Sequence, residues 1–208
     1  MKTKFLTTAA VVLALSLSTG AQASLVARTG GMVYDDVNNI TWAADANLAQ
    51  TSGYSGYDAD GLMTWANAVA WADQLRLGGY TDWSLPTTVP AVWDMNQTGS
   101  QMGNLFYTQL GGVAYSSITT THNANYTLFT NVKNSEYWSG SEYATIPSYA
   151  WNFNTGNGYQ DYYNKDVQYY AWAVRPGDVA AVPVPGAFWL FGSALVALTG
   201  LKRRGSIG

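Results

Sequence analysis

The sequence predicts an α+β domain in which helices precede a set of short antiparallel strands. Apolar residues recur at helical spacing over residues 62–77 and again over 101–110. From residue 126 onward, short alternating segments are separated by Asn, Gly and Pro. The region between the two apolar chain ends, residues 24–177, has the size of one domain. We therefore expect a single α+β domain with two helices.

Two brief strands are expected at the start of this domain. The segment 31–42 has two apolar stretches around an Asp/Asn turn, which is typical of a hairpin. The residues expected to face inward are Val33, Ile40 and Trp42. A polar, Gly-rich loop over 49–61 follows.

The first helix is expected to begin after Asp60, as its cap, and to end before Gly78 and Gly79. One apolar stripe comprises Leu62, Trp65, Val69 and Ala72, and a second pair comprises Trp71 and Leu75. The helix over 101–110 presents Met102, Leu105, Phe106 and Gln109 on one stripe and ends at two glycines. Both helices should pack against the core.

Five segments are predicted as strands of an antiparallel sheet: 126–132, 136–142, 149–153, 159–163 and 169–175. Four tryptophans lie in apolar surroundings and are interpreted as core residues: Trp83, Trp138, Trp151 and Trp172. Arg175, at the end of the last segment, is interpreted as a buried structural cation that binds carbonyls or a carboxylate.

The N-terminus has the layout of a secretory signal peptide. Lys2 and Lys4 precede an apolar stretch over residues 5–17, and Ala21 and Ala23 supply the small residues that a signal peptidase needs. This stretch is short for the roughly 30 Å hydrocarbon core of a membrane. We expect a signal peptide over residues 1–23 and export of the rest.

The C-terminal segment 178–208 has an apolar stretch bounded by prolines and cations. Residues 186–201 form the expected transmembrane helix, and the cations after it should remain in the cytoplasm. The pattern resembles the PEP-CTERM sorting signal at Pro183, Pro185, Trp189, Leu190, Phe191, Gly192 and Ser193, followed by Lys202, Arg203 and Arg204. Val184 stands where the name-giving motif has Glu. The resemblance implies processing by an exosortase in a Gram-negative, exopolysaccharide-producing bacterium. It also implies an inner-membrane intermediate, then location at the cell surface or in the extracellular matrix.

Charge and cysteine content exclude two classes of function. Residues 24–185 contain five Lys and Arg residues and all 13 acidic residues, which gives a net charge of about −8. Such a surface repels nucleic-acid phosphates. The sequence has no cysteine, so it has neither disulfides nor thiol redox chemistry.

Four motifs in the predicted domain resemble the Lcl C-terminal domain family: Asp82 to Thr87 (D-W-S-L-P-T), Tyr137 to Ser141 (Y-W-S-G-S), Ala150 to Phe153 (A-W-N-F) and Ala171 to Gly177 (A-W-A-V-R-P-G). The resemblance covers residues 30–177. It implies a C-type-lectin-like fold and exported, adhesive proteins with no established active site. Thr88 departs from the family pattern, which has Glu after Leu-Pro-Thr.

Metal and catalytic sites have weak sequence support. The Asp-rich segments 35–39 and 58–61 carry oxygen ligands, but neither has the EF-hand spacing, so turn and cap roles are favoured. His122 is the single histidine, and no nucleophile elbow occurs in the sequence. We expect no cofactor, no metal and no enzyme activity. A polysaccharide hydrolase remains as an alternative, with carboxylates drawn from Glu136, Glu142 and Asp161.

The aromatic and amide-rich run from residue 152 to 170 is the best candidate for a binding face. The residues assigned to glycan binding are Asn152, Asn154, Tyr159, Asp161 and Tyr163. An ordinary β-hairpin explains the same run without a ligand. Together these features predict an exported, non-enzymatic surface or matrix protein that binds extracellular polysaccharide. A purely structural envelope or matrix protein is the main alternative.

Overall fold

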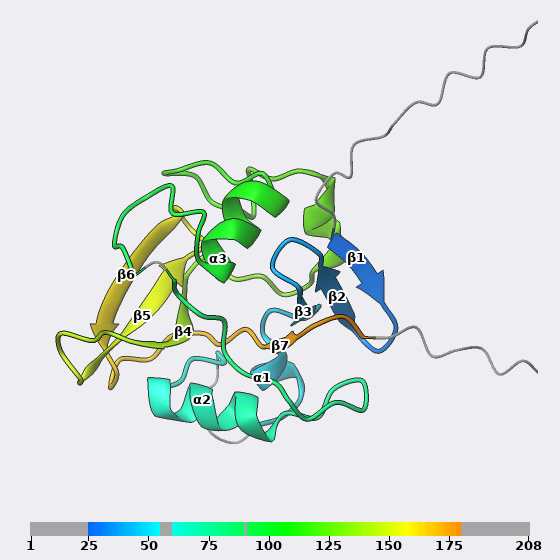
Figure 1. The fold of residues 1–208 in the computed structure, drawn as a ribbon, viewed down its shortest axis with the longest axis horizontal. Coiled ribbons are helices and arrows are strands. Elements are labelled where there is room, and N and C mark those ends of the chain that lie inside the picture. The colour runs from blue at the N-terminus through cyan, green and yellow to red at the C-terminus, as the bar shows by residue number, and fades with distance from the viewer. Residues whose placement is uncertain (1–24, 55–59, 90, 180–208) are drawn as a thin grey trace, which may run out of the picture.

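The structure is a computed structural model that describes residues 25–54, 60–89 and 91–179, and its architecture is α+β as predicted (Figure 1). One antiparallel sheet has the order β1-β2-β3-β7, formed by Leu25–Arg28, Met32–Asp35, Ile40–Ala43 and Val174–Pro176. The other has the order β4-β5-β6, formed by Glu136–Glu142, Tyr149–Asn154 and Tyr159–Asn164. The helices are α1 (Leu48–Thr51), α2 (Trp65–Gln74), α3 (Gln101–Gly103), a π-helix (Asn104–Gln109) and a 3-10 helix (Ala124–Leu128).

The predicted signal peptide and sorting tail lie outside the described residues, apart from the first two residues of the tail segment. Within the described ranges, no helix has the length and apolar character needed to cross a membrane.

The predicted hairpin is confirmed as β2 and β3, which place Val33 opposite Trp42. Val33, Ile40 and Trp42 are all buried. The carboxylate of Asp35 organises the turn, since it accepts hydrogen bonds from the backbone N–H groups of Val37 and Asn38. This acidic segment therefore has the predicted turn role. Neither β1 nor the pairing of β3 with the distant β7 was predicted.

Helix α2 is shorter than expected and faces the core differently. Its N-cap is Thr64, whose hydroxyl accepts from the N–H of Asn67, so the expectation of an Asp60 cap is wrong. The buried stripe comprises Ala68, Trp71, Ala72 and the capping residue Leu75. Val69 lies beside this stripe and is 37% exposed, contrary to prediction. Successive residues of a helix are rotated by about 100°, so the burial of Ala68, Trp71 and Ala72 leaves Val69 beside the buried side.

The second predicted helix is confirmed in position, but most of it is π-helical. Its predicted stripe is buried, including Met102, Phe106 and the polar Gln109. Gly112 follows with its backbone packed on the ring of Phe106, where an added Cβ would lie 2.5 Å from a ring carbon. The tight return of the chain after this helix therefore needs glycine.

The three central strand predictions are confirmed to within one residue as β4, β5 and β6. The strand over 126–132 is wrong, because this segment begins in the 3-10 helix and forms only an isolated bridge from Thr130 to Asp45. The last predicted strand is reduced to β7. The residues before it cross between the sheets: Tyr170 pairs with Tyr137 of β4, and Ala173 accepts from Ala43 of β3. This crossing divides the strands into two sheets rather than one.

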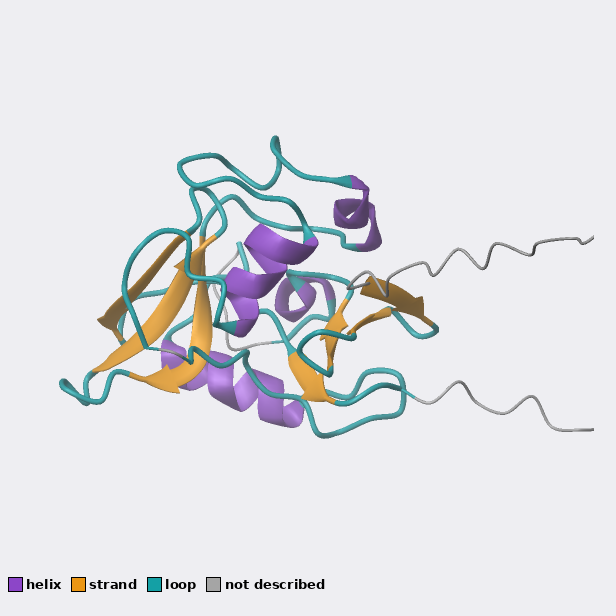
Figure 2. Ribbon diagram, turned by 45° about the horizontal axis from the view of Figure 1, so that its top comes forward, coloured by secondary structure: helices purple, strands orange, loops and turns teal. Residues whose placement is uncertain are grey.

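Aromatic rings fill the core between the sheets, as predicted for Trp83, Trp138, Trp151 and Trp172, which are at most 3% exposed. The indole N–H of Trp138 donates to the carbonyl of Met63 at 2.9 Å, and that of Trp172 donates to the carbonyl of Ala43 at 2.8 Å. The helix that starts with α3 lies between the two sheets (Figure 2). Burial makes all four rings structural, and the satisfied indole donors of Trp138 and Trp172 also fix the orientation of those two rings.

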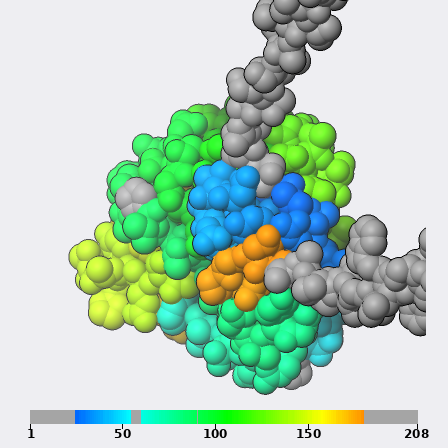
Figure 3. All heavy atoms as spheres, turned by 45° about the vertical axis from the view of Figure 1, so that its right-hand side comes forward, coloured from blue at the N-terminus to red at the C-terminus, as the bar shows by residue number. Residues whose placement is uncertain are grey.

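The two ends of the described chain meet on one side of the molecule. Arg28 of β1 forms an ion pair of 2.6 Å with Asp178, which follows β7. Figure 3 shows the blue N-terminal strands and the orange C-terminal segment next to each other. The strand β6 lies at the far end of the molecule from β1 (Figures 1 and 2).

Candidate functional site

The five residues predicted to bind glycan lie on one face of the β4-β5-β6 sheet. The register places Asn152 opposite Asp161 and Asn154 opposite Tyr159, and Tyr163 is two residues further along β6. Directly paired residues of antiparallel strands point to the same side, and so do alternate residues along one strand. The strands thus bring the predicted set together.

These five side chains are not equally accessible. Asn152 is 3% exposed. The amide of Asn154 is already engaged, because it donates to Glu136 at 2.7 Å and accepts from the N–H of Gly156 at 2.7 Å. Tyr159 and Asp161 are half-buried, and Tyr163 is 49% exposed. The accessible part of the predicted site is therefore β6 rather than β5.

Two aromatic residues beside β6 were missed in the sequence. Trp93 is 58% exposed and precedes Asp94, which forms an antiparallel bridge with Gln160 of β6. Tyr115 is 81% exposed, and its N–H donates to the carbonyl of Asn157 in the β5–β6 turn at 2.8 Å. Both lie in loops without a periodic pattern, so nothing in their local sequence indicated the neighbourhood of β6.

We name the surface formed by Trp93, Tyr115, Tyr159, Asp161 and Tyr163 the β6 platform. Among the large apolar side chains that the described residues expose, the aromatic ones are Trp93, Tyr115 and Tyr163, and all three belong to this platform. An aromatic surface of this kind is a typical feature of a binding site.

Tyr115 has a backbone conformation that a bulky side chain rarely adopts. Its φ of 64° lies in the left-handed region. Two hydrogen bonds hold the loop in place, from the N–H of Tyr115 to Asn157 and from the N–H of Ser116 to Val113. The backbone thus presents the Tyr115 ring to solvent without packing it, at a cost of about 1 kcal/mol or more.

The electrostatic character of the platform is acidic. Partial burial raises the pKa of Tyr159, and the carboxylates of Asp161 and Asp94 raise it further. The phenol therefore stays protonated at neutral pH and can donate a hydrogen bond. Three of the described cations form ion pairs elsewhere, Arg28 with Asp178, Lys165 with Glu142 and Arg175 with Asp82.

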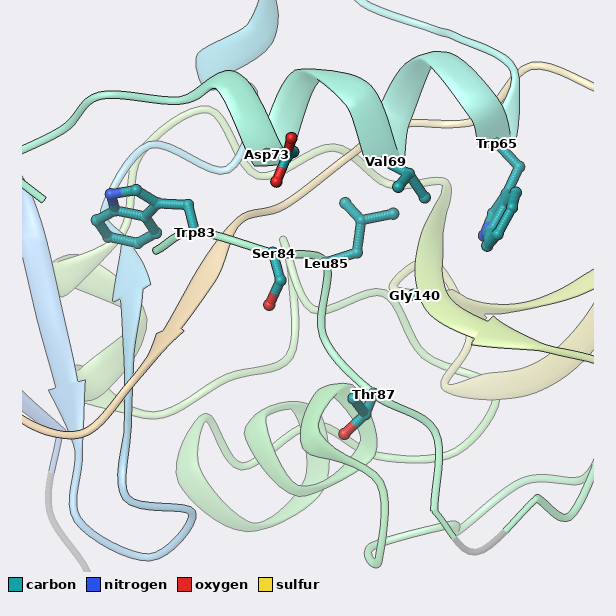
Figure 4. A pocket seen from close by; sticks show the side chains of 8 residues that line it. All are labelled: Trp65, Val69, Asp73, Trp83, Ser84, Leu85, Thr87 and Gly140. Carbon is teal, nitrogen blue, oxygen red and sulfur yellow. The ribbon is translucent and has the colours of Figure 1, made fainter. Parts of the chain in front are cut away.

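A cleft of about 270 Å³ lies between α2 and the segment 83–87 (Figure 4). It is lined by Trp65, Val69, Asp73, Trp83, Ser84, Leu85, Thr87 and Gly140. Most of the lining outside α2 comes from two of the motifs singled out in the sequence, D-W-S-L-P-T and Y-W-S-G-S. The sequence predicted that both motifs belong to one domain, but it did not predict that they line the same cleft.

Arg175 has the structural role expected from the sequence. It is 8% exposed, and its guanidinium donates to both carboxylate oxygens of Asp82, at 2.8 and 2.9 Å. It also lies 4.0 Å from the centre of the Tyr80 ring. The hydrogen bonds from Arg175 lower the pKa of Asp82 below its ordinary value.

The carboxylates considered for hydrolysis are held by neighbours. Glu136 accepts hydrogen bonds from Asn154 and Ser135, and Glu142 forms an ion pair with Lys165 at 3.1 Å. His122 stacks on Tyr126 with 4.1 Å between ring centres. In the described ranges, no three His, Cys, Asp or Glu side chains are grouped to hold a metal. Asp58 lies outside these ranges.

The model of the Lcl C-terminal domain family matches residues 31–175. The chain therefore belongs to the Lcl C-terminal domain family, as its motifs suggested. Membership indicates an extracellular or surface protein. The chain matches no curated protein and no solved structure.

Proposed function

We propose that this protein is a non-enzymatic, polysaccharide-binding component of the bacterial cell surface or extracellular matrix, and that it binds through the β6 platform. The observation that carries this proposal is the gathering of Trp93, Tyr115 and Tyr163 around one strand. Sugar rings stack their C–H faces on exposed aromatic rings, and carboxylates such as Asp161 accept hydrogen bonds from sugar hydroxyls.

Export and sorting form a second part of the proposal, supported by the two chain ends. Residues 1–23 act as a signal peptide, and the segment 178–208 directs exosortase processing through an inner-membrane intermediate. The described chain ends beside β1, at the far end of the molecule from β6 (Figure 1). A tail that leaves there would keep the β6 platform turned away from the membrane. A C-type-lectin-like relationship of the domain is part of the same proposal.

A glycan array probed with residues 24–185, which contain every described residue, tests the proposal. We expect saturable binding by the unchanged protein. The variant in which Tyr159, Asp161 and Tyr163 are changed to Ala should lose this binding while its thermal unfolding remains cooperative. Val37→Ala serves as the control, because Val37 is 47% exposed in the β2–β3 turn. An array without binding would favour the structural alternative, and release of reducing ends that depends on Glu136 or Glu142 would show a hydrolase.

A further inference from the structure

The cleft between α2 and the segment 83–87 has one apolar wall held in a fixed position. Trp65, Val69 and Asp73 are spaced four residues apart, so they follow one side of α2. The indole N–H of Trp65 donates to the carbonyl of Ser139 at 2.8 Å. The ammonium of Lys165 lies 4.3 Å from the centre of the same ring. These contacts hold the ring in one orientation, and Figure 4 shows it at one end of the cleft.

The opposite wall is equally well anchored. The carbonyl of Pro86 accepts hydrogen bonds from the N–H of Gly140 and the hydroxyl of Ser139, at 2.9 and 2.8 Å. Leu85 forms a buried apolar part of the lining, and the exposed residues Ser84 and Thr87 bring hydroxyl groups. A preformed site loses little conformational freedom on binding, which favours even a small ligand.

The chemistry of the lining indicates the class of ligand. The cleft offers two indole rings, one at each end, the aliphatic side chains of Val69 and Leu85, two hydroxyl groups and the carboxylate of Asp73 (Figure 4). Apolar surface with a few polar groups suits a sugar ring, which is apolar on its C–H faces and polar at its edge. The lining contains Asp73 and no Lys or Arg, and the charge of Lys165 beside the Trp65 ring is paired with Glu142 at 3.1 Å. The carboxylate of Asp73, uncompensated by any lining residue, would therefore repel an anionic sugar. A volume of about 270 Å³ has room for only one or two sugar rings.

We propose that this cleft is a second sugar-binding site, selective for uncharged pyranose units, with Trp65 as the stacking ring and Asp73 as a hydrogen-bond acceptor. It shares no residue with the β6 platform. The proposal rests on the proposed function, because both sites would take polysaccharide. One protein molecule could then bind two polysaccharide chains, or two stretches of one chain, and gain avidity from weak sites.

Oxidative footprinting of the full chain in detergent, read by mass spectrometry, distinguishes the two sites. Trp65 reports on the cleft and Trp93 reports on the platform. The exposed His122, which belongs to neither site, serves as the internal reference for the radical dose. The probes are neutral trisaccharides of glucose, galactose, mannose and N-acetylglucosamine, with trigalacturonate as the anionic comparison. A site of this size binds in the roughly millimolar range, so about 10 mM of at least one neutral probe should slow Trp65 oxidation at least about threefold.

Two variants on α2 form a matched pair. Val69→Phe fills the cleft and should abolish protection of Trp65 while protection of Trp93 is retained. Ala66→Phe adds the same ring at an exposed position of α2 outside the cleft lining and should leave both unchanged. Asp73→Asn should weaken neutral probes and raise the relative binding of trigalacturonate.

The outcomes separate the two proposals. Protection of Trp93 alone, or no protection by any neutral probe, would overturn the cleft site. Protection of Trp65 by trigalacturonate as strong as by the neutral probes would overturn its selectivity. Protection of Trp65 alone would support the cleft and reject the β6 platform.

Discussion

The buried and the exposed aromatic residues of this protein are held in place by different means. Trp138 and Trp172 are at most 1% exposed, contact other rings and donate their indole hydrogens to backbone carbonyls. Trp93 and Tyr115 are 58% and 81% exposed and are positioned by the backbone bonds of their loops. The first group supplies burial energy, whereas the second contributes little to the core. Substitutions should therefore divide cleanly into effects on stability and effects on binding.

The largest expected effect tests the buried group. Trp138→Ala or Trp151→Ala should lower the free energy of unfolding by about 3–5 kcal/mol, because a large ring is removed from a packed interior. Trp93→Ala, a matched change at an exposed ring, should stay within about 0.5 kcal/mol. Urea denaturation measures all three. Costs below about 1 kcal/mol for both buried positions would remove the distinction between the groups.

Alkaline pH tests, without a mutation, two tyrosines that pack on the buried tryptophans: Tyr137 on Trp172 and the half-buried Tyr169 on Trp138. Burial raises the pKa of Tyr137 well above its ordinary value and that of Tyr169 to about 12. Their contribution to stability is complete below the unfolded pKa of about 10 and is lost as pH rises toward the folded values. Stability should fall by about 1.4 kcal/mol per pH unit and per tyrosine above pH 10. Unfolding monitored together with tyrosinate absorbance checks this. Stability that stays level between pH 10 and 11 would contradict it.

A smaller effect is expected at the ion pair that joins Asp82 to Arg175. Asp82→Asn should cost about 1 kcal/mol near pH 7, since Asp82 is half exposed. The lowered pKa of Asp82 means that the carboxylate stabilises the fold above pH of about 4, and that this contribution is lost as pH falls through the folded pKa. The two proteins should converge in acid. A difference that persists at pH 2 would assign the cost to packing instead.

At Tyr115 binding should fall while stability does not. Tyr115→Gly removes the strain of a φ of 64° and should leave stability unchanged or raise it by up to about 1 kcal/mol. Retention on the polysaccharide identified by the array should fall, because an exposed stacking ring is lost. Loss of stability would show that the ring has a packing role. Full retention on the polysaccharide would show that the ring contacts no ligand.

How much the sequence could predict depends on whether a signal is local. Alternation located β4, β5 and β6 to within one residue, and the Asp/Asn turn located the first hairpin. The buried side of α2 was predicted in part: the predicted pair of Trp71 and Leu75 is buried, whereas Val69 of the other predicted stripe is exposed. Both sets are apolar, so only packing against the core decides between them. The segment 126–132 has the composition of a strand, but it begins in the 3-10 helix and forms only the isolated bridge from Thr130 to Asp45.

By itself, the sequence determined the α+β class, the family, the buried tryptophans and the common face of the predicted β5 and β6 residues. Tertiary structure alone decided that Trp93 and Tyr115 join β6, that two motifs 53 residues apart meet at Pro86 and Ser139, and that the chain from Tyr169 to Ala173 separates two sheets. The physical reason is that periodicity and turn chemistry act over a few residues. Loop positions and clefts depend on contacts between distant segments, which leave no pattern in the local sequence.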